Sequence, residues 1–145
     1  MILISHRGNI DGQNSSKENT LDYIIEAINE GFDVEIDIYY KKDTFYLGHD
    51  YPKYKINLID IAPYKNKLWI HCKNIDALFY LKDDYHCFFH DADDVVLTSK
   101  NFMWTYSGKP LTSKSIAVMP EKHYSDIQLY NCIGICSDYI KKYVI

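Results

Sequence analysis

Two acidic side chains on one short stretch are the residues of this sequence that most directly suggest chemistry. Glu35 and Asp37 alternate with valine and isoleucine across residues 33–40. Because successive side chains of a β-strand point to opposite faces, this stretch predicts a strand with one apolar and one acidic face. Neighbouring carboxylates repel each other unless a positive charge lies between them, and a divalent cation with oxygen ligands would supply it. A solvated outer face of a strand is the alternative interpretation of the same pattern.

Other side chains capable of chemistry stand at or just beyond the ends of further predicted strands. They are His6, Arg7, His49, His71, Lys73, Ser137 and Asp138. In parallel α/β folds the carboxyl ends of the strands meet at one rim, which is where ligands bind. Histidine carries protons near neutral pH, and the planar fork of arginine matches phosphate oxygens. The set therefore predicts one site with proton carriers, cations and a metal-binding carboxylate pair.

The elements that must position these side chains alternate between strands and helices. Apolar runs predict strands at residues 2–4, 33–40, 67–73, 87–89, 102–106, 115–119 and 133–136, with a hairpin strand at 45–47. Helical spacing predicts helices at about 19–30 and at 75–81, and weaker ones at 58–64 and 124–130. A strand, a helix and a second strand in that order indicate a parallel pair with a right-handed crossover. We therefore expect an α/β domain with a largely parallel sheet.

Length and composition indicate one globular domain over residues 1–145. Hydrophobic residues make up 47% of the chain, the net charge is -4, and there is no basic block that would follow nucleic acid or an anionic membrane. No apolar run approaches the length of a membrane span, and the apolar start is too short for a signal peptide. The four cysteines lack CxxC spacing, which favours reduced thiols. We expect a cytoplasmic protein that does not insert into membranes.

Several short motifs, taken together and in order, resemble the glycerophosphodiester phosphodiesterase family of the phospholipase-C-like phosphodiesterase superfamily. They are His6-Arg7-Gly8, Glu18-Asn19-Thr20, Glu35-x-Asp37, His49-Asp50 and, near the C-terminus, Gly134-Ile135-Cys136-Ser137-Asp138. The resemblance is close over residues 1–50, looser at 67–74 and 133–140, and not evident between 82 and 130. Each triplet alone is a weak match, whereas the ordered set is fairly specific.

The resemblance implies a (β/α) TIM-barrel-like fold that hydrolyses a small-molecule phosphodiester with bound Mg²⁺ or Ca²⁺. Position by position, it makes His6 and His49 the acid/base pair, while Arg7 and Lys73 contact the phosphate. It makes Glu35 and Asp37 metal ligands, and Glu18 a residue that supports the substrate site. A cation and an arginine placed beside the phosphate stabilise the charge that develops during attack. Trp104 and Tyr106, on the strand predicted at 102–106, are further candidates for the pocket wall, with core and rim packing as the alternative.

Two departures from the family pattern change what we expect. The family usually has a glutamate as third metal ligand where this chain has His71, which suits Mn²⁺ or Zn²⁺ better than Ca²⁺. Typical barrels run to about 250 residues. With 145 residues we expect a reduced barrel of about seven strands with shortened or missing outer helices. Such a barrel has an exposed flank that covering loops or a second copy, as a homodimer, would protect.

Three hypotheses about function follow. The first is a metal-dependent hydrolase of glycerophosphodiester-like substrates, with attack by a neighbouring substrate hydroxyl, giving a cyclic phosphate, as a variant. The second is a catalytically inactive domain that binds phosphorylated sugars or polymers in the same pocket. The third is a structural domain in which the polar residues form buried ion pairs, so that breaking a pair would destabilise the fold.

Overall fold

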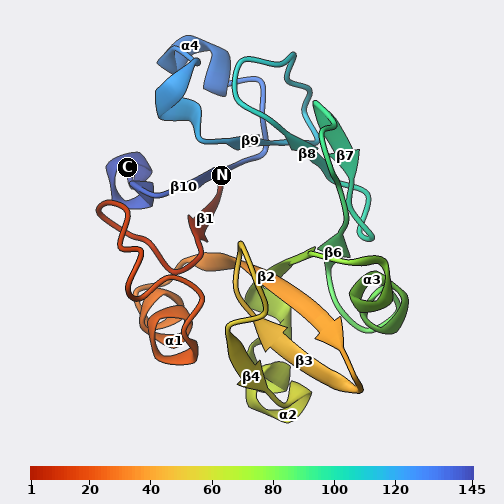
Figure 1. Ribbon diagram of the computed structural model, residues 1–145. Coiled ribbons are helices and arrows are strands. Elements are labelled where there is room, and N and C mark those ends of the chain that lie inside the picture. Colours follow the sequence, from red (N-terminus) through yellow and green to blue (C-terminus); the bar gives the residue numbers. More distant parts are fainter.

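The computed structural model describes all 145 residues as a mixed α/β domain built on a curled, ten-stranded sheet (Figure 1). Seven strands run parallel, with each adjacent pair hydrogen-bonded. In spatial order they are β6 (Cys87–Phe88), β5 (Leu68–Cys72), β2 (Asp33–Lys41), β1 (Ile2–His6), β10 (Gly134–Ser137), β9 (Ser115–Val118) and β8 (Met103–Thr105). All seven lie within one or two residues of their predicted positions, and the parallel arrangement is confirmed.

Three antiparallel strands extend this sheet. β3 (Thr44–Leu47) forms the predicted hairpin with β2, and β4 (Tyr54–Ile56) continues it. β7 (Val95–Leu97) pairs with β8. β4 and β7 were not predicted, because three residues are too few to show a clear alternation.

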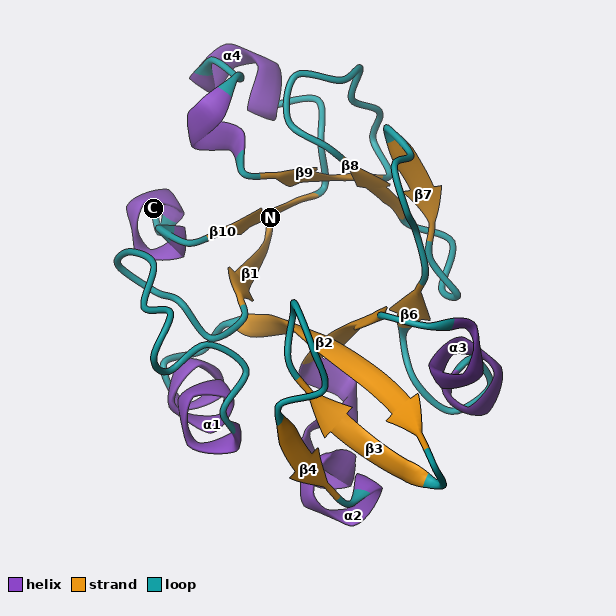
Figure 2. Ribbon diagram, in the orientation of Figure 1, coloured by secondary structure: helices purple, strands orange, loops and turns teal.

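The sheet curls without closing completely (Figure 2). β6 and β8 stand at the two ends of the parallel series and do not pair with each other. Between them, the Ser99 amide donates a hydrogen bond to the Cys87 carbonyl at 2.9 Å. The sheet is therefore a partial barrel, with its gap spanned by the segment that carries β7.

The helices are short and lie outside the curl (Figure 2). They are α1 (Leu21–Asn29), α2 (Leu58–Ile61), α3 (Ile75–Leu81) and α4 (Asp126–Leu129), with 3₁₀ turns at Ala62–Lys67, Pro120–Lys122 and Ile140–Tyr143. The prediction of a helix at 124–130 was too long. None of the helices has the length and apolar character needed to cross a bilayer.

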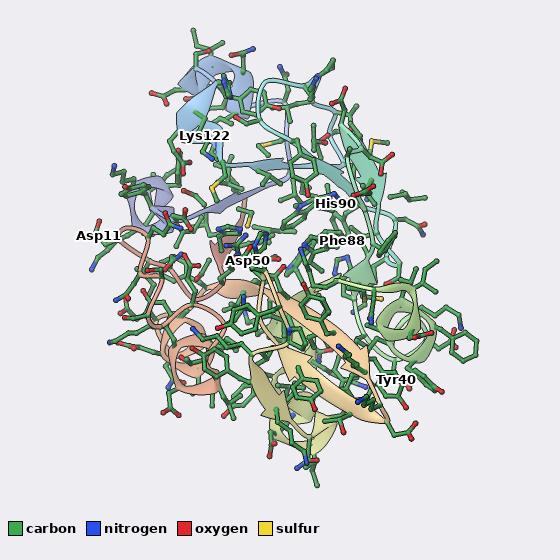
Figure 3. The ribbon with its side chains drawn as sticks, in the orientation of Figure 1. Asp11, Tyr40, Asp50, Phe88, His90 and Lys122 are labelled. Atoms are coloured by element: carbon green, nitrogen blue, oxygen red, sulfur yellow. The ribbon has the colours of Figure 1, made fainter.

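The sheet separates two apolar clusters. The outer one packs strand residues such as Ile36 against α1 and α3. The inner one contains Ile4, Trp69, Phe88, Trp104, Ile116, Val118 and Cys136, and Figure 3 shows Phe88 and His90 directed toward the interior of the curl. The acidic face of β2 also points inward: Glu35 is 2% exposed and Asp37 is fully buried. The interpretation of this face as a solvated outer surface is therefore wrong.

Candidate active site

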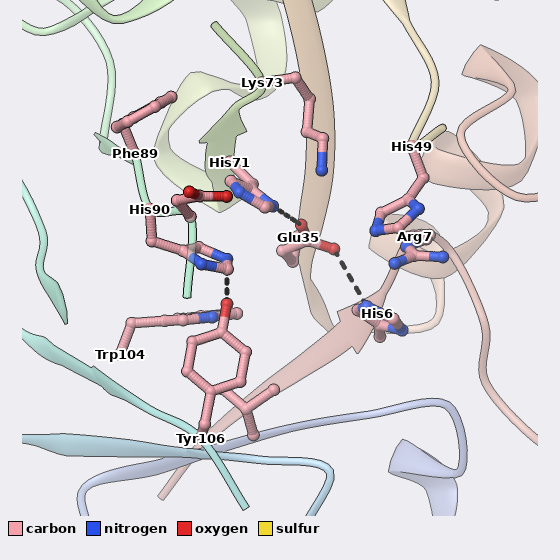
Figure 4. A pocket seen from close by; sticks show the side chains of 12 residues that line it. His6, Arg7, Glu35, His49, His71, Lys73, Phe89, His90, Trp104 and Tyr106 are labelled. Atoms are coloured by element: carbon pink, nitrogen blue, oxygen red, sulfur yellow. Dashed lines mark hydrogen bonds and ion pairs between the residues drawn. The ribbon is translucent and has the colours of Figure 1, made fainter. Parts of the chain in front are cut away.

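Strand register brings two histidines beside the carboxylate pair. β2 lies between β1 and β5, with Glu35 opposite His6 and Asp37 opposite His71. The Nδ1 atom of His71 lies 3.1 Å from Asp37 Oδ1 and 3.9 Å from Glu35 Oε1. On the other side, His6 Nε2 lies 3.8 Å from Glu35 Oε2 (Figure 4). Residues distant in sequence therefore converge because three parallel strands are adjacent.

Glu35, Asp37 and His71 form a buried group that could hold a metal ion. One potential ligand atom from each residue lies within 4.8 Å of the other two. Glu35 Oε2 is buried and has no hydrogen-bond partner, while Asp37 Oδ1 is buried with His71 Nδ1 at 3.1 Å. A buried carboxylate oxygen normally has a donor or a metal, so Glu35 Oε2 fits a cation site. Two carboxylates with one imidazole suit metals such as Mn²⁺ and Zn²⁺.

The two carboxyl groups have opposite electrostatic environments. Burial and the neighbouring charge of Asp37 raise the pKa of Glu35. Burial alone would also raise the pKa of Asp37, but the His71 hydrogen bond and the Arg7 charge outweigh it and lower that pKa. Asp37 therefore holds its negative charge by means of protein partners, whereas Glu35 lacks an equivalent positive partner.

Arg7 is held by an unusual backbone segment between β1 and α1. Arg7 and Asn19 both have left-handed backbones, with φ of 56° and 59°. The backbone N–H of Asn19 donates a hydrogen bond to the Arg7 carbonyl at 3.1 Å. Non-glycine residues in this conformation store roughly 1–3 kcal/mol of strain and cluster at functional sites. Gly8, with φ of 93°, has no room for a side chain, since a Cβ would lie 2.6 Å from the Tyr23 ring. The two motifs at 6–8 and 18–20 thus form one unit.

This unit places the arginine against acidic partners. Arg7 Nε lies 3.2 Å from Asp37 Oδ2, and Nη1 lies 3.4 Å from Glu18 Oε2. Asn19 donates to Asp37 Oδ2 at 2.9 Å and accepts from the Asp37 amide at 3.0 Å. Asn19 also explains why α1 begins at Leu21 rather than at the predicted residue 19: its side chain holds β2 instead of continuing the helix.

His6 is oriented by Asp138, one of the polar residues predicted to meet at the strand ends. His6 Nδ1 lies 2.7 Å from Asp138 Oδ1, and Asn9 Nδ2 donates to the same oxygen at 2.7 Å. Burial by itself lowers the pKa of His6, but the Asp138 hydrogen bond and the nearby Glu35 charge raise it above its usual value. The Asp138 contact occupies Nδ1, so Nε2 is the nitrogen that can exchange a proton with a ligand in the cavity.

His49 reaches the site from the turn after β3. Gly48 makes this turn possible, because its φ is 145° and a Cβ there would lie 2.2 Å from the Tyr51 carbonyl. Tyr39 donates to the His49 carbonyl at 2.9 Å, and His49 Nδ1 lies 2.7 Å from Asp50 Oδ1. The side chain is 39% exposed and lines the cavity beside Arg7 (Figure 4).

These groups border a cavity of about 430 Å³ (Figure 4). Of the residues predicted for the site, those in its lining are His6, Arg7, Glu35, His49, His71, Lys73 and Trp104. Glu18 lies behind Arg7, where it accepts from Asn9 Nδ2 at 2.8 Å, and Asp37 lies behind His71. Both support the wall rather than line it. Trp104 is only 2% exposed, so it serves as wall and core together.

Another wall of the cavity is largely aromatic. Phe89, His90, Asp91 and Tyr106 line it as well, and Tyr106 is hydrogen-bonded to His90. The ring of His90 stacks on that of His71, with centroids 4.3 Å apart. His86 and His90 flank β6 and alternate with Phe88, a spacing that places His90 on the same face as Phe88.

Comparisons with known proteins add no relative. No family model matches the chain, and neither the curated proteins nor the solved structures contain a match.

Proposed function

We propose that this protein is a metal-dependent phosphodiester hydrolase of the glycerophosphodiester type, on a reduced TIM-barrel-like fold. The observation that carries the proposal is one cavity in which a buried carboxylate–histidine group, with an unpartnered oxygen on Glu35, faces an arginine, a lysine and two further histidines. The seven parallel strands, with the site at their carboxyl ends, support the proposed fold.

Each group has a role that its surroundings support. Glu35, Asp37 and His71 would hold the cation, which when bound neutralises charge on the phosphoryl oxygens. Arg7 binds those oxygens through its guanidinium, and Lys73, whose Nζ lies 3.9 Å from Asp37 Oδ1, adds a second positive charge. A preorganised positive site of this kind stabilises the transition state of phosphoryl transfer more than the ground state.

The two histidines supply the proton transfers. Attack forms a bond from phosphorus to the incoming oxygen and breaks the bond to the leaving alkoxide. One proton must leave the incoming hydroxyl and one must reach the departing oxygen. The raised pKa of His6 favours its protonated form, so His6 is the donor to the leaving oxygen through Nε2. His49 then accepts the proton of the attacking hydroxyl.

The test is metal-dependent release of alcohol from a glycerophosphodiester. We expect His6→Ala and His49→Ala each to lower turnover by roughly 10²–10⁴-fold while the circular dichroism spectrum stays native. Product analysis for linear against cyclic phosphate identifies the attacking hydroxyl. Absence of turnover across a broad panel of diesters with Mg²⁺, Ca²⁺, Mn²⁺ and Zn²⁺ would contradict the proposal.

A binding domain without turnover is the second candidate. The observation that favours it is that Asp37 already has Arg7 at 3.2 Å and His71 at 3.1 Å as partners, so positive charge from the protein occupies part of the site. Tight binding of phosphorylated sugars without hydrolysis would support it. A purely structural role would appear as strong destabilisation by Arg7→Ala with no phosphate affinity to lose.

A further inference from the structure

A second, smaller cavity adjoins the first and shares two of its residues. It has a volume of about 180 Å³, and Arg7 and His49 line both cavities. Its other walls come from the segment between β1 and α1, including Gln13 and Ser15, and from the segment between β3 and β4, including Lys53. The group expected to bind phosphate and one of the expected proton carriers therefore stand between two chambers.

The small chamber is polar, and its lining includes Lys53, whose Nζ has no carboxylate partner and lies 5.0 Å from the centroid of the Tyr54 ring. Its carboxylates are partnered within the protein, Glu18 by Arg7 and Asn9, and Asp50 by His49. The amide of Gln13 and the hydroxyl of Ser15 both donate and accept hydrogen bonds. Walls with this many donors and acceptors suit a small group with several hydroxyls better than an apolar one.

The far side of the large cavity has the opposite character. The ring of Tyr106 lies 4.8 Å from that of His90, centroid to centroid, and the rings of Trp104 and Phe88 are 4.6 Å apart. Figure 4 shows Trp104, Tyr106 and His90 together, across the cavity from Arg7 and His49. Because these rings are fixed against one another, they form a preformed wall that suits a flat apolar group.

We propose that the substrate is an asymmetric phosphodiester, with a small polyol on one side of the phosphorus and a flat, ring-bearing alcohol on the other. The polyol occupies the chamber at Gln13 and Ser15, the ring lies against Tyr106 and Trp104, and the phosphate lies between them at Arg7. This inference rests on the proposed function, since it needs the phosphate at that position.

Three probes that share a phosphate test the two chambers separately. Isothermal titration calorimetry in the presence of Mn²⁺ would measure the binding of inorganic phosphate, phenyl phosphate and glycerol 3-phosphate. Each ester carries only one of the two groups, the ring or the polyol. We expect each ester to bind more tightly than inorganic phosphate.

Substitutions in the two chambers should change the binding of different esters. We expect Tyr106→Ala to weaken the binding of phenyl phosphate about tenfold, because a lost aromatic pair is worth on the order of 1 kcal/mol. The affinity for glycerol 3-phosphate should stay nearly unchanged. Tyr106→Phe, which keeps the ring, is the matched control and should retain phenyl phosphate affinity. Gln13→Ala, at an exposed position, should weaken glycerol 3-phosphate by roughly three- to tenfold and spare phenyl phosphate.

The possible failures are distinguishable. If both esters bind no better than inorganic phosphate, the placement of the ring and the polyol in the two chambers is overturned while the phosphate site stands. The same conclusion follows if both variants weaken the binding of both esters equally. If inorganic phosphate itself does not bind, with or without Mn²⁺, the proposed function is overturned with it.

Discussion

Glu35 combines near-complete burial with a carboxylate oxygen that no protein group satisfies. It is 2% exposed, and its closest cationic neighbours are His6 Nε2 at 3.8 Å and His71 Nδ1 at 3.9 Å. A buried charge without a close partner costs stability, which a residue retained for folding alone would not explain. A metal ligand does explain it, because the missing partner is then the cation.

Glu35→Gln separates these two explanations. In metal-free protein we expect the free energy of unfolding to stay equal or to rise by about 1–3 kcal/mol, because a buried charge is removed. We expect the variant to lose the rise in melting temperature that Mn²⁺ gives the parent protein. Urea unfolding and thermal melts measure both. A metal-free variant less stable than the parent, with the Mn²⁺ effect intact, would show that Glu35 serves only the fold.

His71 sets the choice of metal. Imidazole favours Zn²⁺, whereas carboxylates favour Mg²⁺, Ca²⁺ and Mn²⁺. We expect His71→Glu to raise the affinity for Ca²⁺ relative to Zn²⁺ by at least about tenfold, with calorimetric titration of each metal as the measurement. An unchanged ratio of the two affinities would exclude His71 as a ligand.

Residue types predicted most of the residues of this site, but not which of them line the cavity and which lie buried behind its wall. The alternation of Glu35 and Asp37 with apolar residues indicated two faces of one strand correctly. It could not show that Asp37 lies behind the wall, because that depends on Asn19 and Arg7 from another element. Sequence could not decide whether His90 and Tyr106 belong to the pocket or to the packing around it, because the register of short strands is fixed by packing rather than by local sequence.

At the scale of elements, the segment between β1 and α1 holds the site together through Asn19. Its side chain gives β2 two hydrogen bonds, both to Asp37, and its φ is 59°. Asn19→Ala leaves two buried groups unpaired and places alanine in a disfavoured conformation. We expect a loss of about 2–4 kcal/mol in unfolding free energy by urea titration.

Asn19→Gly separates the two contributions. Glycine accepts the left-handed backbone but makes neither hydrogen bond, so its loss should be smaller by about 1 kcal/mol. Ser16→Ala, at an exposed position of the same segment, should change stability by less than about 0.5 kcal/mol. If Asn19→Ala behaves like Ser16→Ala, the segment does not depend on this contact.

Long periodic elements were predicted better than short ones. α3 begins and ends where its apolar spacing and the Asn74 cap indicate, and Asn74 accepts a hydrogen bond from the Ala77 amide at 3.2 Å. β2 extends only one residue past its prediction. α4 and β7 are too short to complete a period, so tertiary packing decides where they begin and end.

At the scale of the whole molecule, the inner cluster ties overall stability to pH through His86. Its ring lies 4.0 Å from that of Trp69, centroid to centroid, and its Nε2 lies 2.7 Å from Thr98 Oγ1. Burial lowers the pKa of His86 from 6.5 to about 4. The folded state therefore prefers the neutral ring, and its stability is complete above the unfolded value of 6.5.

Stability should fall as the pH drops from 6.5 toward 4, by up to about 3 kcal/mol from this residue. We expect the unfolding free energy of His86→Gln to decline less over this range than that of the parent protein. Urea titrations between pH 7.5 and 4.5 measure the difference. The raised pKa of His6 acts in the opposite direction but is common to both proteins. Parallel curves would contradict the role given to His86.

The partial barrel leaves β6 and β8 unpaired with each other, and a backbone hydrogen bond joins Ser99 to Cys87 between them. The segment carrying β7 covers this gap, as one of the two predicted solutions for the exposed flank. The homodimer remains a prediction, and sedimentation analysis measures it directly.

The central claim is that a cation and a phosphoryl group bind next to each other at the carboxyl ends of β1, β2 and β5. Phosphorus-31 nuclear magnetic resonance of glycerol 3-phosphate measures it, because bound paramagnetic Mn²⁺ accelerates relaxation of a nearby phosphorus nucleus. We expect strong relaxation enhancement with the parent protein, and loss of it in Glu35→Gln and Arg7→Ala. Enhancement no greater than that from free Mn²⁺, or equal enhancement in all three proteins, would contradict the claim.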